Sequence, residues 1–253
     1  MEWRGRKRRY LVWARPLCTA VMLAVFVGML AGCLYPGEER QERRVSYLES
    51  VDRIQRAVDQ FQADQGILPI ITAGQETPRY EKFRIDLDLL NKQGYIDEIP
   101  TTAFEKGGSA YFLIINEESD PAVKVLDLLT TQKINDVQRL VDKYRNSQNG
   151  KLPVTSEEET YPGLFTVDLK LAGAQDYSLK SVYSGQSQDY LVDKDGRVYA
   201  DYAFDIMQAV DKSESSPQAD KDLREYLTEQ SFFVPVKSLP YRMIDGVPVP
   251  QPE

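Results

Sequence analysis

The side chain best placed for covalent chemistry is the thiol of Cys33, which directly follows the small residues Ala31 and Gly32. An apolar run at residues 17–30 precedes it, and ahead of that run stand six basic side chains: Arg4, Arg6, Lys7, Arg8, Arg9 and Arg15. Basic residues before an apolar segment are typical of a leader that enters the membrane from the cytoplasmic side. The run has about 14 residues, whereas a spanning helix needs roughly 20. Residues 1–32 are therefore predicted to be a cleaved signal segment.

The four residues Leu30-Ala31-Gly32-Cys33 resemble the bacterial lipobox. This resemblance implies that the Cys33 thiol receives a diacylglyceryl group and becomes the first residue of the mature chain. One alternative is an uncleaved membrane anchor with an incidental cysteine, and another is a twin-arginine export signal at Arg8-Arg9-Tyr10-Leu11. Small residues before the cysteine and the short apolar run favour lipid attachment at Cys33.

The composition after cleavage limits the possible partners. Without residues 1–32 the chain keeps 25 basic and 38 acidic side chains, a net charge of −13. Such a field repels nucleic acid and anionic headgroups, so we expect no nucleic-acid partner and attachment to the membrane through acyl chains on Cys33. Since Cys18 leaves with the leader and Cys33 carries lipid, the folded part is expected to lack both disulfides and free thiols.

The chain contains no histidine, which excludes Ser-His-Asp and Cys-His nucleophiles and imidazole metal sites. A glycan hydrolase that uses two carboxylates remains an alternative, but no pair stands out. Capture of a cation or small solute is a second alternative, for which the candidates are the acidic loop at residues 157–159 and the turn with Asp193, Asp195 and Asp201. This turn lacks the further oxygen ligands of a calcium loop. No catalytic, cofactor-binding or metal-ligating residue is therefore assigned.

The elements that carry these residues occur twice. Residues 51–69 match residues 134–153 at an offset of 83, with one residue inserted before the glycine, and residues 83–89 match 165–171 at an offset of 82. Chance similarity between two amphipathic helices would not also reproduce the Gly-x-Leu-Pro exit and the later Phe-x-apolar-Asp-Leu segment in the same order. The sequence therefore predicts a tandem duplication.

Each repeat is predicted to begin with a helix whose apolar side chains recur every three or four residues. These are Leu48, Val51, Ile54, Val58 and Phe61 in the first repeat and Ile134, Val137, Val141 and Tyr144 in the second. Gly66 and Gly150 are expected to end the helices in a left-handed conformation, before Pro69 and Pro153. Each repeat then closes with a predicted hairpin: residues 110–115 with 123–127, and residues 190–192 with 197–200.

The predicted architecture is α+β, in which one helix of each module packs on a small antiparallel sheet. We expect a signal segment at 1–32, a membrane-proximal tether at 33–46, repeats at 47–130 and 131–203, and C-terminal helices with a closing hairpin at 204–253. The closing hairpin is predicted to pair residues 232–236 with residues 241–244.

The chain shows two resemblances to known families. The order of helix, Gly-x-Leu-Pro, a short Leu-rich element and a hairpin is similar to the globular heads of pseudopilins, and this implies the fold alone because the apolar segment here ends in a cysteine. Four further segments carry the second resemblance: residues 30–36, the Ala57–Phe61 helix with its Leu68-Pro69 exit, the Pro100-x-x-Ala-Phe104 segment and Asp195-Gly196. Through them the whole chain resembles YphF-like lipoproteins of Bacillus-type bacteria, which implies an envelope protein without known chemistry.

The leading hypothesis is a non-enzymatic envelope protein, lipid-anchored outside the cytoplasm, that binds another envelope protein or the cell wall. Paired modules would create a groove between them. Tyrosine side chains that could line such a groove, although most are expected to serve packing, are Tyr95, Tyr111, Tyr161, Tyr183 and Tyr190.

Overall fold

The computed structural model describes residues 36–213 and 221–252, with side chains from residue 43 onwards. Cys33 and the predicted signal segment lie outside these residues. The chain divides into one unit up to residue 46 and a compact unit of residues 47–253. The described part of the predicted tether, from residue 36, forms the beginning of helix α2 (Pro36–Gln65).

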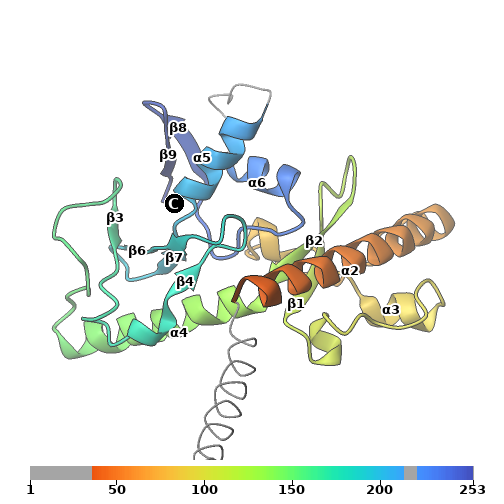
Figure 1. Cartoon of the computed structure of the whole chain (residues 1–253), viewed down its shortest axis with the longest axis horizontal. Coiled ribbons are helices and arrows are strands. Elements are labelled where there is room, and N and C mark those ends of the chain that lie inside the picture. The colour runs from red at the N-terminus through yellow and green to blue at the C-terminus, as the bar shows by residue number, and fades with distance from the viewer. Residues whose placement is uncertain (1–35, 214–220, 253) are drawn as a thin grey trace, which may run out of the picture. The chain divides into compact units, whose positions relative to one another are not determined.

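The fold is α+β, as predicted, and its strands follow one another in groups that are separated by helices (Figure 1). The α-helices of the compact unit after α2 are α3 (Leu87–Lys92), α4 (Leu128–Ser147), α5 (Ala203–Lys212) and α6 (Arg224–Gln230). Short 3-10 helices are η2 (Arg79–Glu81), η3 (Phe104–Lys106) and η4 (Gln175–Tyr177). The strands are β1 (Ala110–Ile115), β2 (Ala122–Asp127), β3 (Leu164–Thr166), β4 (Leu179–Lys180), β5 (Ser187–Gln188), β6 (Tyr190–Asp193), β7 (Val198–Ala200), β8 (Tyr241–Ile244) and β9 (Val247–Pro250).

The strands form small antiparallel sheets: β1-β2, β3-β6-β7, β4-β5 and β8-β9. An antiparallel bridge between Arg84 and Leu113 adds the segment before α3 to the free edge of β1. We call residues 47–127 the first module and residues 128–203 the second module. Each module then has three adjacent antiparallel segments. They are the segment at Arg84 with β1 and β2 in the first module, and β3 with β6 and β7 in the second.

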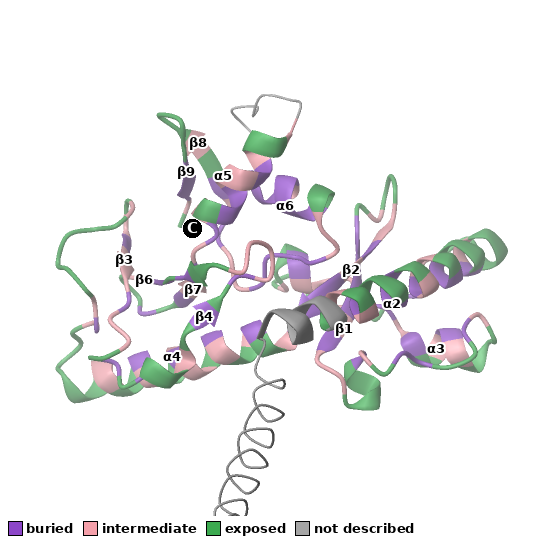
Figure 2. Cartoon of the chain, viewed as in Figure 1, coloured by how far each residue is buried: buried purple, intermediate pink, exposed green. Residues whose placement is uncertain are grey.

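The long helices form where the sequence places an apolar stripe. In α2 the buried side chains follow a spacing of three and four residues, and Figure 2 shows this stripe against the sheet with an exposed opposite face. The stripe begins at Tyr47, whereas Leu48 is 47% exposed, so the prediction that Leu48 belongs to the core was wrong. In α4 the carboxylate of Asp127 caps the first turn by accepting from the backbone N–H of Thr130 (2.9 Å).

A glutamine on each long helix holds the hairpin of its own module. Gln55 accepts from the backbone N–H of Val123 (2.7 Å) and donates to the carbonyl of Pro121 (3.0 Å). Gln138, at the same place in α4, accepts from the N–H of Val198 (2.7 Å) and donates to the carbonyl of Gly196 (2.7 Å). The two helices therefore meet their hairpins in the same register.

After each long helix, the segment that leaves the helix is hydrogen-bonded to a later segment of the same module in the same way. The N–H of Asp86 donates to the carbonyl of Pro69, and the N–H of Asp168 donates to that of Pro153, both at 2.8 Å. The aspartates then accept from backbone N–H groups two or three residues later, through which Asp86 caps α3. In the second module this aspartate is followed by a turn rather than by an α-helix.

A closing hairpin is present in the C-terminal segment, but the predicted pairing of residues 232–236 with residues 241–244 was wrong. Residues 241–244 pair with β9 instead, because Asp245 and Gly246 both have positive φ (50° and 80°) and form a tight turn directly after β8. The predicted helices of the C-terminal segment are present as α5 and α6. Residues 232–236 lie against the first module, where they pair with β2.

Candidate functional site

The most constrained part of the C-terminal segment is residues 231–237, which we call the strap. On one side, the N–H of Val125 in β2 donates to the carbonyl of Phe232 (2.7 Å), and the N–H of Val234 donates to the carbonyl of Val125 (3.0 Å). On the other side, the N–H of Ala200 in β7 donates to the carbonyl of Lys237 (3.1 Å). The strap therefore covers the outer edges of both hairpins and joins the two modules.

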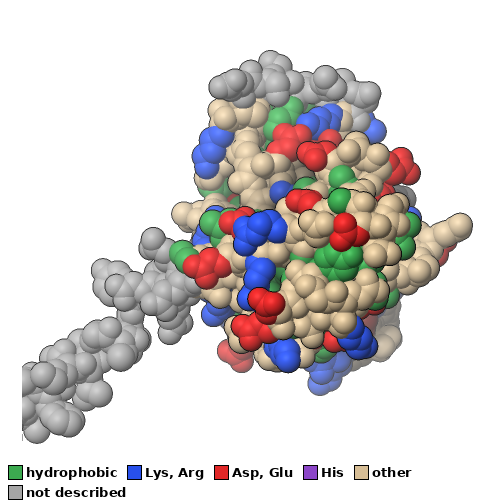
Figure 3. All heavy atoms as spheres, turned by 90° about the vertical axis from the view of Figure 1, so that its right-hand side faces the viewer, with side chains coloured by type: hydrophobic (Ala, Val, Ile, Leu, Met, Phe, Trp, Pro, Cys, Tyr) green, Lys and Arg blue, Asp and Glu red, His purple; other side chains and the backbone are tan. Residues whose placement is uncertain are grey.

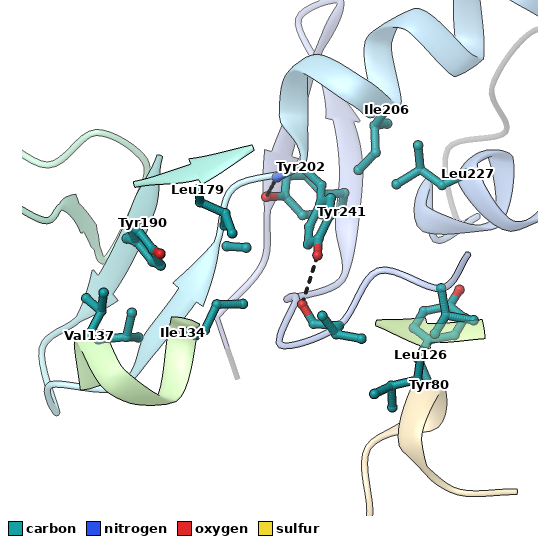
Figure 4. Packing of buried hydrophobic residues seen from close by; sticks show 14 of the residues in the cluster. Tyr80, Leu126, Ile134, Val137, Leu179, Tyr190, Tyr202, Ile206, Leu227 and Tyr241 are labelled. Atoms are coloured by element: carbon teal, nitrogen blue, oxygen red, sulfur yellow. Dashed lines mark hydrogen bonds between the residues drawn. The ribbon is translucent and has the colours of Figure 1, made fainter. Parts of the chain in front are cut away.

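Side chains of the strap complete both cores. Phe233 is buried in the first core, where its ring meets that of Tyr47 edge-on at 5.7 Å. Val234 and Val236 are buried in the second core, together with residues of α5, α6 and β8. The carbonyl of Val236 accepts from the phenol of Tyr202 (3.0 Å), one of the bonds drawn in Figure 4.

A cluster of charged and aromatic side chains fastens η2 of the first module to the C-terminal segment. Arg79 pairs with Glu225 at 2.8 Å, and the guanidinium of Arg224 lies 5.0 Å from the ring centroid of Tyr80. Arg224 is itself held by the carboxylate of Asp222 at 2.7 Å. Tyr80 thus lies beneath a fixed cation and belongs to the same buried cluster as Leu126 and Leu227, which are labelled in Figure 4.

The hydroxyl of Tyr80 is buried without a hydrogen-bond partner among the described residues. Burial raises the pKa of Tyr80 to about 12, against the opposing attraction of the Arg224 and Arg79 cations. An unpartnered buried hydroxyl costs free energy of folding. The ring of Tyr80, rather than its hydroxyl, therefore contributes to stability.

Lys124 of β2 reaches the end of α6. Its ammonium donates to the carbonyls of Thr228 (2.6 Å) and Ser231 (2.9 Å), which stand at the C-terminal end of this helix. Burial lowers the pKa of Lys124. A cation at a helix C-terminus also opposes the negative end of the helix dipole, so Lys124 stabilises the start of the strap.

Asp201, a calcium-ligand candidate in the sequence, has a structural role. One carboxylate oxygen accepts from the phenol of Tyr241 (2.9 Å) and from the N–H of Ala203 (2.9 Å), and the other accepts from the phenol of Tyr161 (3.1 Å). Burial raises the pKa of Asp201, and these hydrogen bonds act against that rise. Both oxygens are thus bonded within the fold, where they hold Tyr161, Tyr241 and the start of α5.

Asp205 is the most isolated carboxylate of the described residues. It is 4% exposed, in the first turn of α5, and its Oδ1 has no hydrogen-bond partner there. The positive end of the helix dipole favours a carboxylate at this place. Sequence analysis missed Asp205, Arg224 and Tyr80, because nothing in their spacing distinguishes them from ordinary surface residues.

Two of the other acidic candidates, Asp193 and Glu159, also serve local structure. Asp193 accepts from the N–H of Arg197 (2.8 Å) and from the phenol of Tyr199 (3.2 Å) in the turn of the second hairpin. In the acidic loop, Glu159 accepts from the N–H of Gly163 and pairs with Lys194, both at 2.8 Å. Within residues 36–213 and 221–252, no three His, Cys, Asp or Glu side chains are grouped so as to hold a metal ion.

The five tyrosines do not line one surface. Tyr190 is buried and its phenol donates to the carbonyl of Tyr177, while Tyr161 is bound to Asp201. Tyr183 packs edge-on against Tyr202, Tyr111 lies under the guanidinium of Arg84 at 3.4 Å, and Tyr95 donates to Asp64. They are packing and bracing residues of different elements.

These observations define the chain as an α+β protein of two similarly bonded modules joined by a C-terminal strap. Residues 47–127 match the YphF family N-terminal domain, a span that coincides with the first module. The predicted resemblance to YphF-like proteins is supported over this span. Neither the curated proteins nor the solved structures contain a match. Among the described helices, none combines the length and the apolar character needed to cross a membrane.

Proposed function

We propose that this protein is a lipoprotein of the cell envelope, held at the outer face of the cell membrane through Cys33, with a binding or structural role rather than an enzymatic one. The observation that carries this proposal is the small-residue cleavage pattern before Cys33, at the end of a short apolar run that follows a basic cluster. Two acyl chains on one cysteine suffice for stable anchoring, whereas one chain binds only marginally.

Lipid attachment is tested by the mass of the protein extracted from membranes. The wild-type chain should begin at a Cys33 that carries diacylglyceryl, whereas Cys33→Ala should retain the leader and no lipid. Cys18→Ala is the matched control, because it removes the other cysteine and should leave processing unchanged. A wild-type protein with an intact Met1 and an unmodified Cys33 would contradict the proposal.

The non-enzymatic part is supported by the engagement of the candidate carboxylates. The hydrolase alternative needs a carboxylic acid that is free to give its proton to the leaving group. Asp201 has the raised pKa typical of such an acid, but both of its oxygens are bonded within the fold. Release of reducing ends from cell-wall glycan by the wild-type protein, lost in Asp201→Asn, would favour the hydrolase instead.

We further propose that the two modules arose by tandem duplication. Two sets of equivalent hydrogen bonds support this. Gln55 and Gln138 each bind the hairpin of their own module, and Asp86 and Asp168 each bind the helix exit of their own module, at the offsets found in the sequence. A main-chain superposition of residues 47–127 on 128–203 in a crystal structure tests it. Failure of the helix and three strands to superpose in one alignment would rule duplication out.

A further inference from the structure

The two modules share a backbone course where the chain leaves each long helix. We call residues 66–71 and residues 150–155 the exit loops. Gly66 and Gly150 have φ of 70° and 86°, and the N–H groups of Ile71 and Thr155 both donate to the strand that returns alongside, at 2.8 and 3.0 Å. Equivalent positions of the exit loops can therefore be compared residue by residue.

The exit loop of the first module exposes apolar side chains that the fold does not require. Ile67 is 64% exposed and Ile71 is 44% exposed. The second module has Lys151 and Thr155 at these positions, on the same hydrogen-bonded frame. Because a polar pair is compatible with this frame, the two isoleucines are available for contact with another surface.

Charge differs between the two exits as well. Beside the first loop lie the exposed carboxylates of Asp64, in the last turn of α2, and Asp88, in the first turn of α3. Asp64 keeps its charge at the surface while it accepts hydrogen bonds from Gln60 and Tyr95. The equivalent positions of the second module hold Ser147 and Lys170. Figure 3 faces the end of the molecule where α2 ends, and hydrophobic side chains there lie among acidic and basic ones.

The second exit has the complementary character. Leu171 is 51% exposed, next to Lys170 and close to the loop that carries Lys151, since Asp168 is hydrogen-bonded to Pro153. Among the described residues, neither lysine has an ion-pair partner, and neither does Asp88. One module therefore presents isoleucines beside carboxylates, and the other presents a leucine beside lysines.

We propose that the exit surface of the first module docks on the exit surface of the second module in another copy of this chain. Ile67 and Ile71 meet Leu171, while Asp64 and Asp88 face Lys151 and Lys170. The contact is heterologous, so a pair of copies keeps one unused surface of each kind, and further copies associate head to tail. Screening by salt weakens it, because its specificity comes from exposed charges.

Disulfide trapping of the full chain in detergent tests this contact, whether or not Cys33 carries lipid. Ile71→Cys protein and Leu171→Cys protein are mixed under oxidising conditions. A mixed dimer should form in the mixture well above the level in either protein alone, and it should decline as salt is raised. A dimer of Ile71→Cys alone at the same level, the absence of a mixed dimer, or trapping of a different protein from solubilised membranes would overturn the proposal.

Charge reversal provides the second arm. Asp64→Lys with Asp88→Lys in the Ile71→Cys protein should reduce the mixed dimer at least several-fold. Lys151→Asp with Lys170→Asp in the Leu171→Cys protein should restore it. The matched control reverses Glu118 and Asp120 in the exposed loop between β1 and β2, and it should change nothing. Equal loss in the control, or no recovery in the compensated pair, would contradict the proposed contact.

Discussion

The first and second modules differ least in their main-chain hydrogen bonds and most in what covers them. Each has a helix glutamine bound to its hairpin and a helix exit hydrogen-bonded to the returning strand. The first core, however, takes its buried residues almost entirely from residues 47–125, with Phe233 added. The second core includes side chains of α5, α6 and β8. The hydrogen-bonded frame is thus common to both modules, whereas the second core draws its apolar residues from the second module, the first module and the C-terminal segment.

The family match covers the first module. The matched span ends at Asp127, which is also the residue that caps α4. The second core takes Tyr80, Leu113, Ile115 and Leu126 from the first module and is completed by side chains of the C-terminal segment. The strap is the part of that segment that belongs to both cores.

The largest expected effect comes from truncating the strap. Phe233→Ala should lower the free energy of unfolding by about 3–5 kcal/mol, because it empties a ring-sized space in the first core. Val236→Ala removes less volume from the second core and should cost about 2 kcal/mol. Since residues 47–253 form one compact unit, we expect one thermal transition in both variants.

Calorimetry and amide exchange at β2 and β7 measure this coupling. If the modules are joined as the strap suggests, exchange should rise at both strands in each variant. Two separate transitions, with β2 opened only by Phe233→Ala and β7 only by Val236→Ala, would show that the modules fold independently.

The paired glutamines should give matched effects of intermediate size. Gln55→Ala and Gln138→Ala each leave one backbone N–H and one carbonyl of a hairpin without a partner, at a cost of about 2 kcal/mol. The measurement is denaturant unfolding. Gln60→Ala is the control, because Gln60 bonds only to exposed Asp64 on its own helix, and it should cost less than about 0.5 kcal/mol. Very different losses for Gln55 and Gln138 would mean that the shared hydrogen bonds are not equivalent in energy.

Local signals in the sequence predicted much of this frame. Gly66 follows the last residue of α2 with positive φ, as the Gly-x-Leu-Pro segment indicated, whereas α4 ends at Ser147 and Asn149 adopts positive φ before Gly150. Both internal hairpins have nearly the predicted bounds. The misplaced Leu48 shows the limit of periodicity: Tyr47 and Leu48 are adjacent, and only packing decides which one faces the sheet.

Long-range pairings were beyond the sequence. Residues 232–236 have the β-branched and aromatic character of a strand, but their partner, Val125, lies over one hundred positions earlier. The cluster of Tyr80 and Arg224 was missed for the same reason, since its members come from η2 and the start of α6. Local composition gives the conformation of such residues, whereas their partners depend on the tertiary fold.

The smallest expected effect concerns two buried tyrosines, Tyr80 of the first module and Tyr202 of the second module. Tyr80→Phe removes a hydroxyl without a partner and should stabilise the protein by up to about 1 kcal/mol at neutral pH, as measured by denaturant unfolding. Tyr202→Phe removes the bond to the carbonyl of Val236 and should destabilise it by about 1 kcal/mol. Destabilisation by Tyr80→Phe would indicate that its hydroxyl has a partner in solution.

Alkaline pH should widen the advantage of Tyr80→Phe. The pKa of Tyr80 is about 12 in the folded protein and 10.0 ordinarily, so the unfolded chain loses this proton first. Stability from this group is complete below pH 10 and declines as pH rises towards 12, by on the order of 1 kcal/mol at pH 11. Tyr80→Phe lacks this loss, so its unfolding free energy should fall less between pH 8 and pH 11 than that of the wild-type protein. An equal fall in both proteins would mean that the Tyr80 hydroxyl is more exposed to water in solution than in this structure, so that burial does not raise its pKa.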